Sequence, residues 1–178
     1  MAYSALPTWP LILFGILEPV ALCVNFRVFW AYEKRLVLTV GSIWGYITVL
    51  RSPAQYYADQ TPNAELSKLV FTSQALSLTL QLGNVLLLLA AVAIICCWTI
   101  HPEMSRRYLI VVALADLGHI YAAYRGLGDS TFWDPTQWND MAYGNIGASA
   151  FLHINRWLTI AGAFGKLGSL TRDGRKKQ

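Results

Sequence analysis

The chain has 178 residues, of which 55% are hydrophobic and 13% charged, with a formal net charge of +4. Soluble domains usually carry about 25% charged residues, so this composition argues against a soluble domain. The apolar residues gather in blocks of about 20, the length that spans a hydrocarbon core of about 30 Å. We therefore expect an integral membrane protein with a single domain.

Four segments are expected to cross the bilayer as helices. They are residues 10–30, 69–98, 108–124 and 141–165. Pro19 should kink the first of them, because proline removes a backbone donor in mid-helix. The pattern predicts an all-α fold, namely a transmembrane four-helix bundle over residues 1–166 with a polar pocket inside the membrane.

Residues 34–66 are harder to assign. The apolar run Leu36–Leu50 has only 15 residues, and Lys34, Arg35 and Arg51 flank it. A run this short is more often interfacial or re-entrant than spanning. We expect a lumenal segment that is interfacial or re-entrant, and a fifth span stays open.

Basic residues predict the orientation. They are concentrated in the tail at 167–178 and in Arg106 and Arg107, whereas the loop at 126–140 has no Lys or Arg. Positive charge favours the cytoplasmic side, so the tail and both termini are expected there. The ending at 175–178 weakly resembles a dilysine retrieval signal, which indicates the endoplasmic reticulum.

Each predicted span carries polar residues at helical spacing. They are Glu18 in the first span, Gln74, Ser77, Gln81 and Asn84 in the second, Asp116 and His119 in the third, and Asn145, His153 and Arg156 in the fourth. Ionisable side chains at membrane depth are costly and normally face the bundle interior. We therefore expect these polar faces to meet in one layer.

The charged members of this set point to acid–base chemistry. Glu18 and Asp116 supply two carboxyls against the single guanidinium of Arg156. Because a dry core does not tolerate net charge, one carboxyl should hold a proton. Two acids in different protonation states provide an acid and a base. The competing interpretation is a structural or ligand-binding network, since polar side chains also join membrane helices.

The catalytic interpretation gives each residue a role. Asp116 would be the base, oriented by His119, and Glu18 the acid, although these roles could be reversed. Arg156 would balance the charge. The substrate-binding residues would be Gln81, Asn84, Asn145, Tyr121, His153 and Trp138.

No cofactor is expected. The residues His101, Glu103, His119 and His153 lack the i, i+4 spacing of metal ligands, and no glycine-rich phosphate loop occurs. The basic tail is too short to indicate nucleic-acid binding. The expected partners are a hydrophobic small molecule and the lipid bilayer, and a homo-oligomer stays open.

Several short motifs occur in an order that is typical of one protein family. They are Glu18-Pro19, residues 81–84, residues 116–121, Trp138-Asn139, residues 144–147, and Arg156 ahead of Gly162. The set resembles a family of small four-helix membrane proteins of filamentous fungi, over nearly the whole chain except 34–66. The resemblance implies epoxide opening on polyketide or terpenoid intermediates of secondary metabolism, by water or an internal hydroxyl. The layout is also similar to the sterol-isomerase and sigma-2-receptor (EXPERA) architecture.

Three functions follow from these expectations. The leading hypothesis is a cofactor-independent membrane enzyme that hydrolyses an epoxide or opens it in a cyclisation. The second is a terpene cyclase or double-bond isomerase, with aromatic residues such as Trp30, Tyr121 and Trp157 stabilising a carbocation. The third is a non-enzymatic lipid-binding protein, which predicts a filled interior around Asp116.

Overall fold

The computed structural model describes residues 4–23, 26–28, 41–43, 45–62 and 68–168. The principal helical elements are α1 (Thr8–Ile12), the π-helical η1 (Leu13–Leu17), α2 (Glu18–Cys23), α3 (Tyr46–Arg51), α4 (Pro53–Ala58), α5 (Ser73–Cys97), α6 (Pro102–Leu127) and α9 (Ser149–Ala161). Shorter pieces between α6 and α9 are α7 (Asp129–Phe132), the 3-10 turn η3 (Pro135–Gln137), α8 (Asp140–Ala142) and the π-helical η4 (Tyr143–Ala148). The predicted all-α fold is confirmed for these residues, apart from one short antiparallel pair, β1 (Phe26–Val28) with β2 (Gly41–Ile43).

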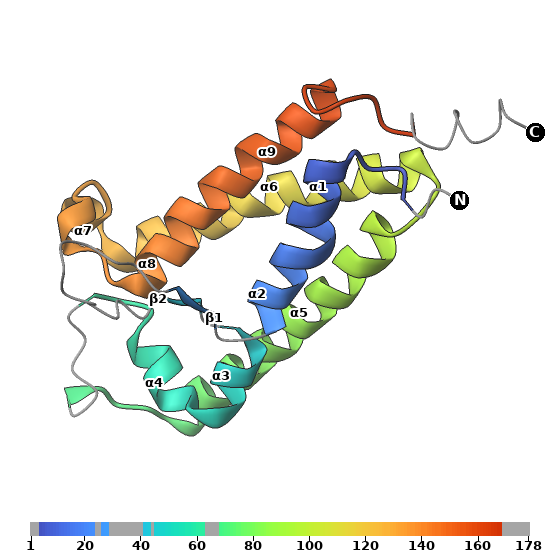
Figure 1. The fold of residues 1–178 in the computed structure, drawn as a ribbon. Helices are drawn as coiled ribbons and strands as arrows, with labels where there is room; N and C mark the ends of the chain where they lie inside the picture. The colour runs from blue at the N-terminus through green and yellow to red at the C-terminus, as the bar shows by residue number, and fades with distance from the viewer. Residues whose placement is uncertain (1–3, 24–25, 29–40, 44, 63–67, 169–178) are drawn as a thin grey trace, which may run out of the picture.

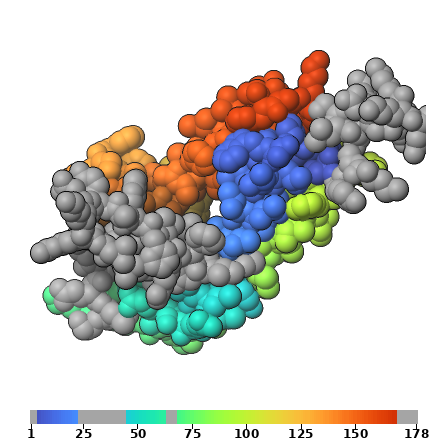
Figure 2. All heavy atoms as spheres, in the orientation of Figure 1, coloured from blue at the N-terminus to red at the C-terminus, as the bar shows by residue number. Residues whose placement is uncertain are grey.

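The elements α1, η1 and α2 follow one another without a break, and we call them together the N-terminal helix. This helix and α5, α6 and α9 form the body of the molecule (Figure 1). Helices α6 and α9 pack along each other, and η1 and α2 pack against α5. The space-filling view places the N-terminal helix between α9 and α5 (Figure 2). Helices α3 and α4 lie against α5. The N-terminal helix therefore joins the α6–α9 pair to α5.

Pro19 shapes the N-terminal helix. Proline has no N–H, so the carbonyl four residues earlier, that of Gly15, loses its usual helical donor. The indole Nε1 of Trp98 donates to this carbonyl at 2.9 Å. The backbone just before Pro19 is π-helical over Leu13–Leu17, a conformation that is frequent next to functional sites. The sequence predicted a kink here, and the structure has this π-helical turn.

The main core lies where the N-terminal helix, α5 and α6 meet. Its buried members are Leu6, Leu13, Phe14, Ala93, Cys97, Tyr108, Leu109 and Val112. Helix α5 contributes small residues, which let neighbouring helices approach closely, as in membrane helix packing. A second cluster of Val49, Tyr56 and Met141 joins α3, α4 and α8.

The helix boundaries differ from those predicted from the sequence. Helix α6 starts at Pro102 instead of residue 108, because proline suits the first helical turn. Helix α9 ends at Ala161, where Gly162 adopts φ 85° and terminates the helix. The first helix ends at Cys23. The predicted tail lies outside the described residues from 169 onward.

The helices that correspond to the predicted membrane segments differ in whether they are long and apolar enough to cross a membrane. One helix in the described part of the chain, α5, is long and apolar enough to cross a membrane, and Thr8–Leu22 forms a shorter apolar helix. Within 34–66, the structure has the short helices α3 and α4. Positions 34–40, 44 and 63–66 of this stretch lie outside the described residues.

Gly83→Ala is expected to destabilise the fold by about 1–3 kcal/mol, the usual range for overpacking a core. A Cβ at Gly83 would lie 2.7 Å from Cγ1 of Val49. Val49 is fully buried and β-branched, so its side chain has little freedom to move. Thermal unfolding in mild detergent measures the effect.

The matched control is Gly118→Ala. Gly118 also lies within a long helix, but a Cβ added there would meet nothing within 4 Å. Because alanine restricts the unfolded chain more than glycine, this change should stabilise by about 0.5–1 kcal/mol. Equal unfolding temperatures for the two variants would contradict the close approach of α3 to α5.

Candidate functional site

A buried cluster of three ionisable side chains joins three helices. Nη1 of Arg156 donates to Oδ2 of Asp116, and Nη2 of Arg156 donates to Oε1 of Glu18. Arg156 is fully buried, and Glu18 and Asp116 are buried to more than nine-tenths. One guanidinium therefore holds the two carboxyls next to each other. We call Glu18, Asp116 and Arg156 the triad.

The positions of the triad follow from helical periodicity. Asp116 continues the buried face of α6 that includes Leu109 and Val112. Arg156 lies on the buried face of α9 with Ser149 and Thr159. Glu18 is the first residue of α2, directly after the π-helical turn. Residues three or four apart share one face of a helix, so each side chain points to where α2, α6 and α9 meet.

The triad leaves polar atoms without partners. Oε2 of Glu18 and Nε of Arg156 are buried and have no hydrogen-bond partner among the described residues, and the same holds for the hydroxyl of Tyr108. The guanidinium also lies 5.1 Å from the ring centre of Phe14, a cation–π contact. More than nine in ten buried polar groups in proteins are paired, so unpaired atoms at one charged cluster indicate a place that can bind a polar group.

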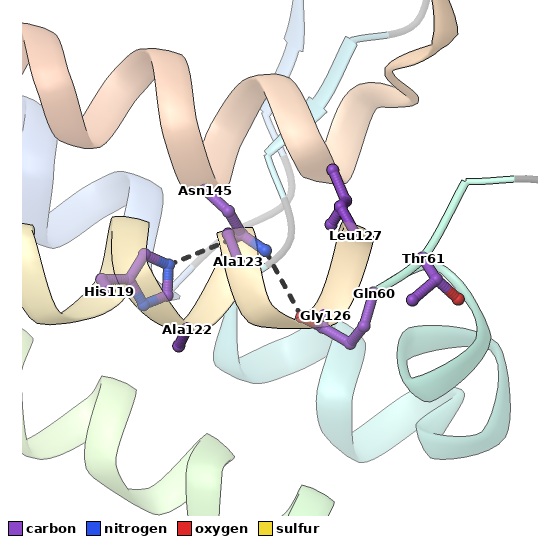
Figure 3. A pocket seen from close by; sticks show the side chains of 8 residues that line it. All are labelled: Gln60, Thr61, His119, Ala122, Ala123, Gly126, Leu127 and Asn145. Atoms are coloured by element: carbon purple, nitrogen blue, oxygen red, sulfur yellow. Dashed lines mark hydrogen bonds between the residues drawn. The ribbon is translucent and has the colours of Figure 1, made fainter. Parts of the chain in front are cut away.

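A second polar group joins His119 of α6 to Asn145 of η4 and to Gln60, which follows α4 (Figure 3). Nε2 of His119 donates to Oδ1 of Asn145 at 3.1 Å, and Nδ2 of Asn145 donates to Oε1 of Gln60 at 3.3 Å. These residues line a cavity of about 150 Å³, together with Thr61, Ala122, Ala123, Gly126 and Leu127. None of the eight lining residues is acidic or basic apart from His119, so the cavity suits a neutral polar group.

His119 does not orient Asp116 as the sequence predicted. Its Nε2 is bonded to Asn145, and the side chain that holds Asp116 is Arg156. His119 lies one helical turn from Asp116, but its hydrogen bond faces the cavity. The orienting role therefore belongs to the guanidinium, for which the sequence predicted only charge balance.

Three predicted substrate-binding residues make contacts away from the triad carboxyls. Nδ1 of His153 donates to the carbonyl of Ala113 at 2.9 Å. The hydroxyl of Tyr121 accepts from Arg125 at 3.2 Å, and the residue is 58% exposed. Nε1 of Trp138 donates to the carbonyl of Thr131 at 2.9 Å. His153 is the nearest of these in sequence to Arg156, three residues earlier on α9.

Gln81 and Asn84 do not face the bundle interior. Both are exposed, and Gln81 bonds only its helical neighbour Ser77 within the described chain. The inward face of α5 consists of Thr79, Gly83, Ala90, Ala93 and Cys97. The prediction that every span turns its polar face inward is therefore wrong for α5.

Three residues at these sites were not predicted. Phe14 lies one helical turn before Glu18, and this spacing could have indicated that the two side chains share one face of the helix. Tyr108 lies about two turns before Asp116 on α6, but its ring gives no sign of polar function. Gln60 falls within the stretch at 34–66 that matched no pattern, so nothing in the sequence pointed to it.

The described residues contain no group of three or more His, Cys, Asp or Glu side chains arranged to hold a metal ion. The side chains available for chemistry in the triad are two carboxyls and a guanidinium, with one imidazole at the neighbouring cavity.

Comparison with known proteins gave one match. No curated protein and no solved structure is similar enough to match the chain. A family model described as a domain of unknown function, DUF7704, matches residues 36–166. This range includes Asp116, His119, Asn145 and Arg156 but not Glu18. Since the matched residues make up most of the chain, the chain belongs to the DUF7704 family.

Proposed function

We propose that this protein is a membrane-embedded enzyme that opens an epoxide in a hydrophobic polyketide or terpenoid intermediate by acid–base chemistry. The observation that carries the proposal is the pair of carboxyls held on one buried guanidinium, with an unpaired oxygen on Glu18. Such a pair supplies a proton donor and a proton acceptor within one small volume.

The surface of the helices supports membrane embedding. Only 22% of the most apolar 18-residue stretch of α5 is buried, and this helix begins at Ser73, far from the N-terminus. A core helix of a soluble protein would be mostly covered. Large apolar side chains are also exposed on other helices, including Ile16, Leu17, Val111, Leu114, Leu117, Phe151, Ile154 and Leu158. Apolar patches of this extent indicate contact with lipid or another protein.

We further propose that the protein lies in the endoplasmic reticulum membrane with both termini in the cytosol. The support is the distribution of basic residues, which favours the cytosolic side for the tail and for Arg106 and Arg107. Both of these arginines are exposed at the start of α6, where they can reach the headgroup region.

The charge of the triad decides its chemistry. Arg156 carries one positive charge, so the triad is neutral when one carboxyl is ionised and the other holds a proton. A buried site strongly favours this neutral state, because an uncompensated charge away from water is costly. The ionised carboxyl can then act as a base and the protonated one as an acid.

In hydrolysis, the protonated carboxyl gives its proton to the epoxide oxygen as a ring C–O bond breaks. The ionised carboxyl takes a proton from the water whose oxygen forms the new C–O bond. The product is a diol, and the two carboxyls have exchanged protonation states. In a cyclisation, a hydroxyl of the substrate replaces water. Asp116 is the proposed base and Glu18 the acid, and the symmetry of their contacts to Arg156 equally permits the reverse.

Arg156 has two tasks in this mechanism. It holds both carboxyls through separate nitrogens, and its charge keeps one of them ionised. The cavity beside His119 and Asn145 would bind a neutral polar group of the substrate, because its polar side chains include two amides and an imidazole. The apolar remainder would lie against the helices or in lipid.

The second candidate is a non-enzymatic lipid-binding protein. The complete burial of Arg156 favours it, because a charge cluster that only fastens three helices would be closed in the same way. The unpaired Oε2 of Glu18 argues against it. A catalytic test separates the two candidates.

Membranes that contain the chain should consume an epoxide from extracts of a strain that lacks it, and the reaction is followed by mass spectrometry in ¹⁸O-labelled water. Hydrolysis gives a product heavier than the epoxide by one labelled water. Cyclisation gives a product of unchanged mass without label, from an epoxide-bearing substrate. A terpene cyclase or isomerase would consume a substrate without an epoxide. Unchanged extracts across complete metabolite profiles would support the lipid-binding candidate.

A further inference from the structure

Helix α5 carries a polar stripe on the side that faces away from the bundle. The polar stripe consists of Gln74, Ser77, Gln81 and Asn84, all of which are exposed. At 3.6 residues per turn, it lies about 180° from the inward face that includes Gly83, Ala90 and Ala93. Helix α5 lies at the edge of the bundle (Figure 1), and the exposure of the four side chains shows that no described helix covers them.

The stripe belongs to a longer row along the same side. Leu88, Ala91 and Ile95 continue it, and all three are exposed. The spacing alternates between three and four residues from Gln74 to Ile95. This alternation keeps one side of a helix facing a parallel partner and is typical of left-handed helix pairs, in membranes as in coiled coils. We call these seven residues the outer seam.

The amides of the stripe need a partner at membrane depth. The side-chain amide of Asn84 makes no hydrogen bond within the described chain, and that of Gln81 makes one long bond, 3.4 Å to Ser77 on its own helix. Lipid chains offer neither donors nor acceptors, so polar side chains in a bilayer turn toward other helices. The seam has no charged residue, and therefore a charged partner surface is not required.

A second copy of the same helix fits these requirements. An amide side chain both donates and accepts, so glutamine is complementary to glutamine. Copies inserted with the same topology place their α5 helices parallel, and a twofold axis along the membrane normal then sets Gln81 against Gln81 and Asn84 against Asn84. Such an isologous contact is the commonest form of homodimer.

We propose that the outer seam of α5 is the interface of a homodimer within the membrane. The inference rests on the membrane embedding of the proposed function. The triad lies on the other side of α5, among α2, α6 and α9. Pairing through the seam therefore does not involve the triad or block access to it.

Cysteine cross-linking in native membranes tests the contact. Ser77→Cys and Leu88→Cys lie on the seam, and their matched controls Leu76→Cys and Leu87→Cys lie one residue earlier, about 100° around the helix. All four positions are exposed. Oxidation should give a covalent dimer for the two seam variants and only the wild-type background for the two controls. Equal cross-linking at seam and control positions would overturn the proposal.

Loss of an amide should weaken the pair. Gln81→Leu and Asn84→Leu keep the helix apolar and are each expected to raise the dissociation constant roughly 3- to 30-fold, the range for one interhelical hydrogen bond. Energy transfer between labelled copies in vesicles measures it, with Leu87→Ala as the control. Unchanged affinity in both amide variants would contradict a polar interface.

The two proposals fail in different ways. If alkaline washing strips the wild-type chain from membranes, embedding is wrong and so is the proposed function. If the chain stays in the membrane but the seam cysteines do not cross-link, only the homodimer is refuted.

Discussion

Replacing Arg156 by methionine is expected to destabilise the protein by about 3–5 kcal/mol, the cost of removing one partner of a buried ion pair. Methionine fills much of the same space, so the loss comes from charge rather than from a cavity. Glu18 and Asp116 would face each other without the guanidinium that each of them contacts. The unfolding temperature in mild detergent, followed by tryptophan fluorescence, should fall by many degrees.

Two variants show whether the effect comes from the triad. Arg107→Met removes an exposed arginine of α6 and should change stability by no more than about 0.5 kcal/mol. Combining Arg156→Met with Glu18→Gln and Asp116→Asn removes every ionisable group of the triad and should restore much of the stability. A single Arg156→Met variant that unfolds at the wild-type temperature would show that the carboxyls do not depend on the guanidinium.

The triad itself could be predicted from the sequence. Glu18, Asp116 and Arg156 are ionisable residues in apolar segments, and this combination is so costly in a core that the groups must meet. Helical periodicity gives their faces. Helical periodicity does not give hydrogen-bond partners. The sequence therefore predicted that Asp116 is oriented by the nearby His119, and not by Arg156, which is 40 residues away.

The inward face of α5 was assigned wrongly for a physical reason. In water, apolar residues mark the buried face of a helix, and in a membrane polar residues are expected to do so. Neither signal holds for α5, because its packing depends on small residues that let α3 and the N-terminal helix approach. Gly83 and Ala90 mark the inward face, whereas Gln81 and Asn84 mark the opposite one.

Helix ends depended on local chemistry that hydropathy does not detect. Arg106 and Arg107 suggested that the third span begins after them, yet both are exposed on a helix that already starts at Pro102. Gly162 ends α9 through its left-handed backbone. Proline at a helix start and glycine at its end are readable signals, and giving them weight over hydropathy would have corrected both boundaries.

Replacing Asp116 by asparagine, or Glu18 by glutamine, is expected to lower turnover by about 10²- to 10⁴-fold, the usual contribution of a general acid or base. The amides keep the shape of the acids and can still accept from Arg156, but they neither take up nor release a proton in the reaction. Each single variant should fold, because one ionised carboxyl is left to pair with the guanidinium. The measurement is turnover of the epoxide identified by the labelled-water experiment.

A control variant and a double variant separate a catalytic role of the two carboxyls from a purely structural one. Glu103→Gln alters an exposed carboxyl at the start of α6 and should leave both turnover and stability unchanged. The double variant Glu18→Gln with Asp116→Asn leaves Arg156 without a counter-charge, so it should lose stability as well as activity. If each single variant folds and retains full turnover, acid–base catalysis by these carboxyls is excluded, even where the double variant unfolds.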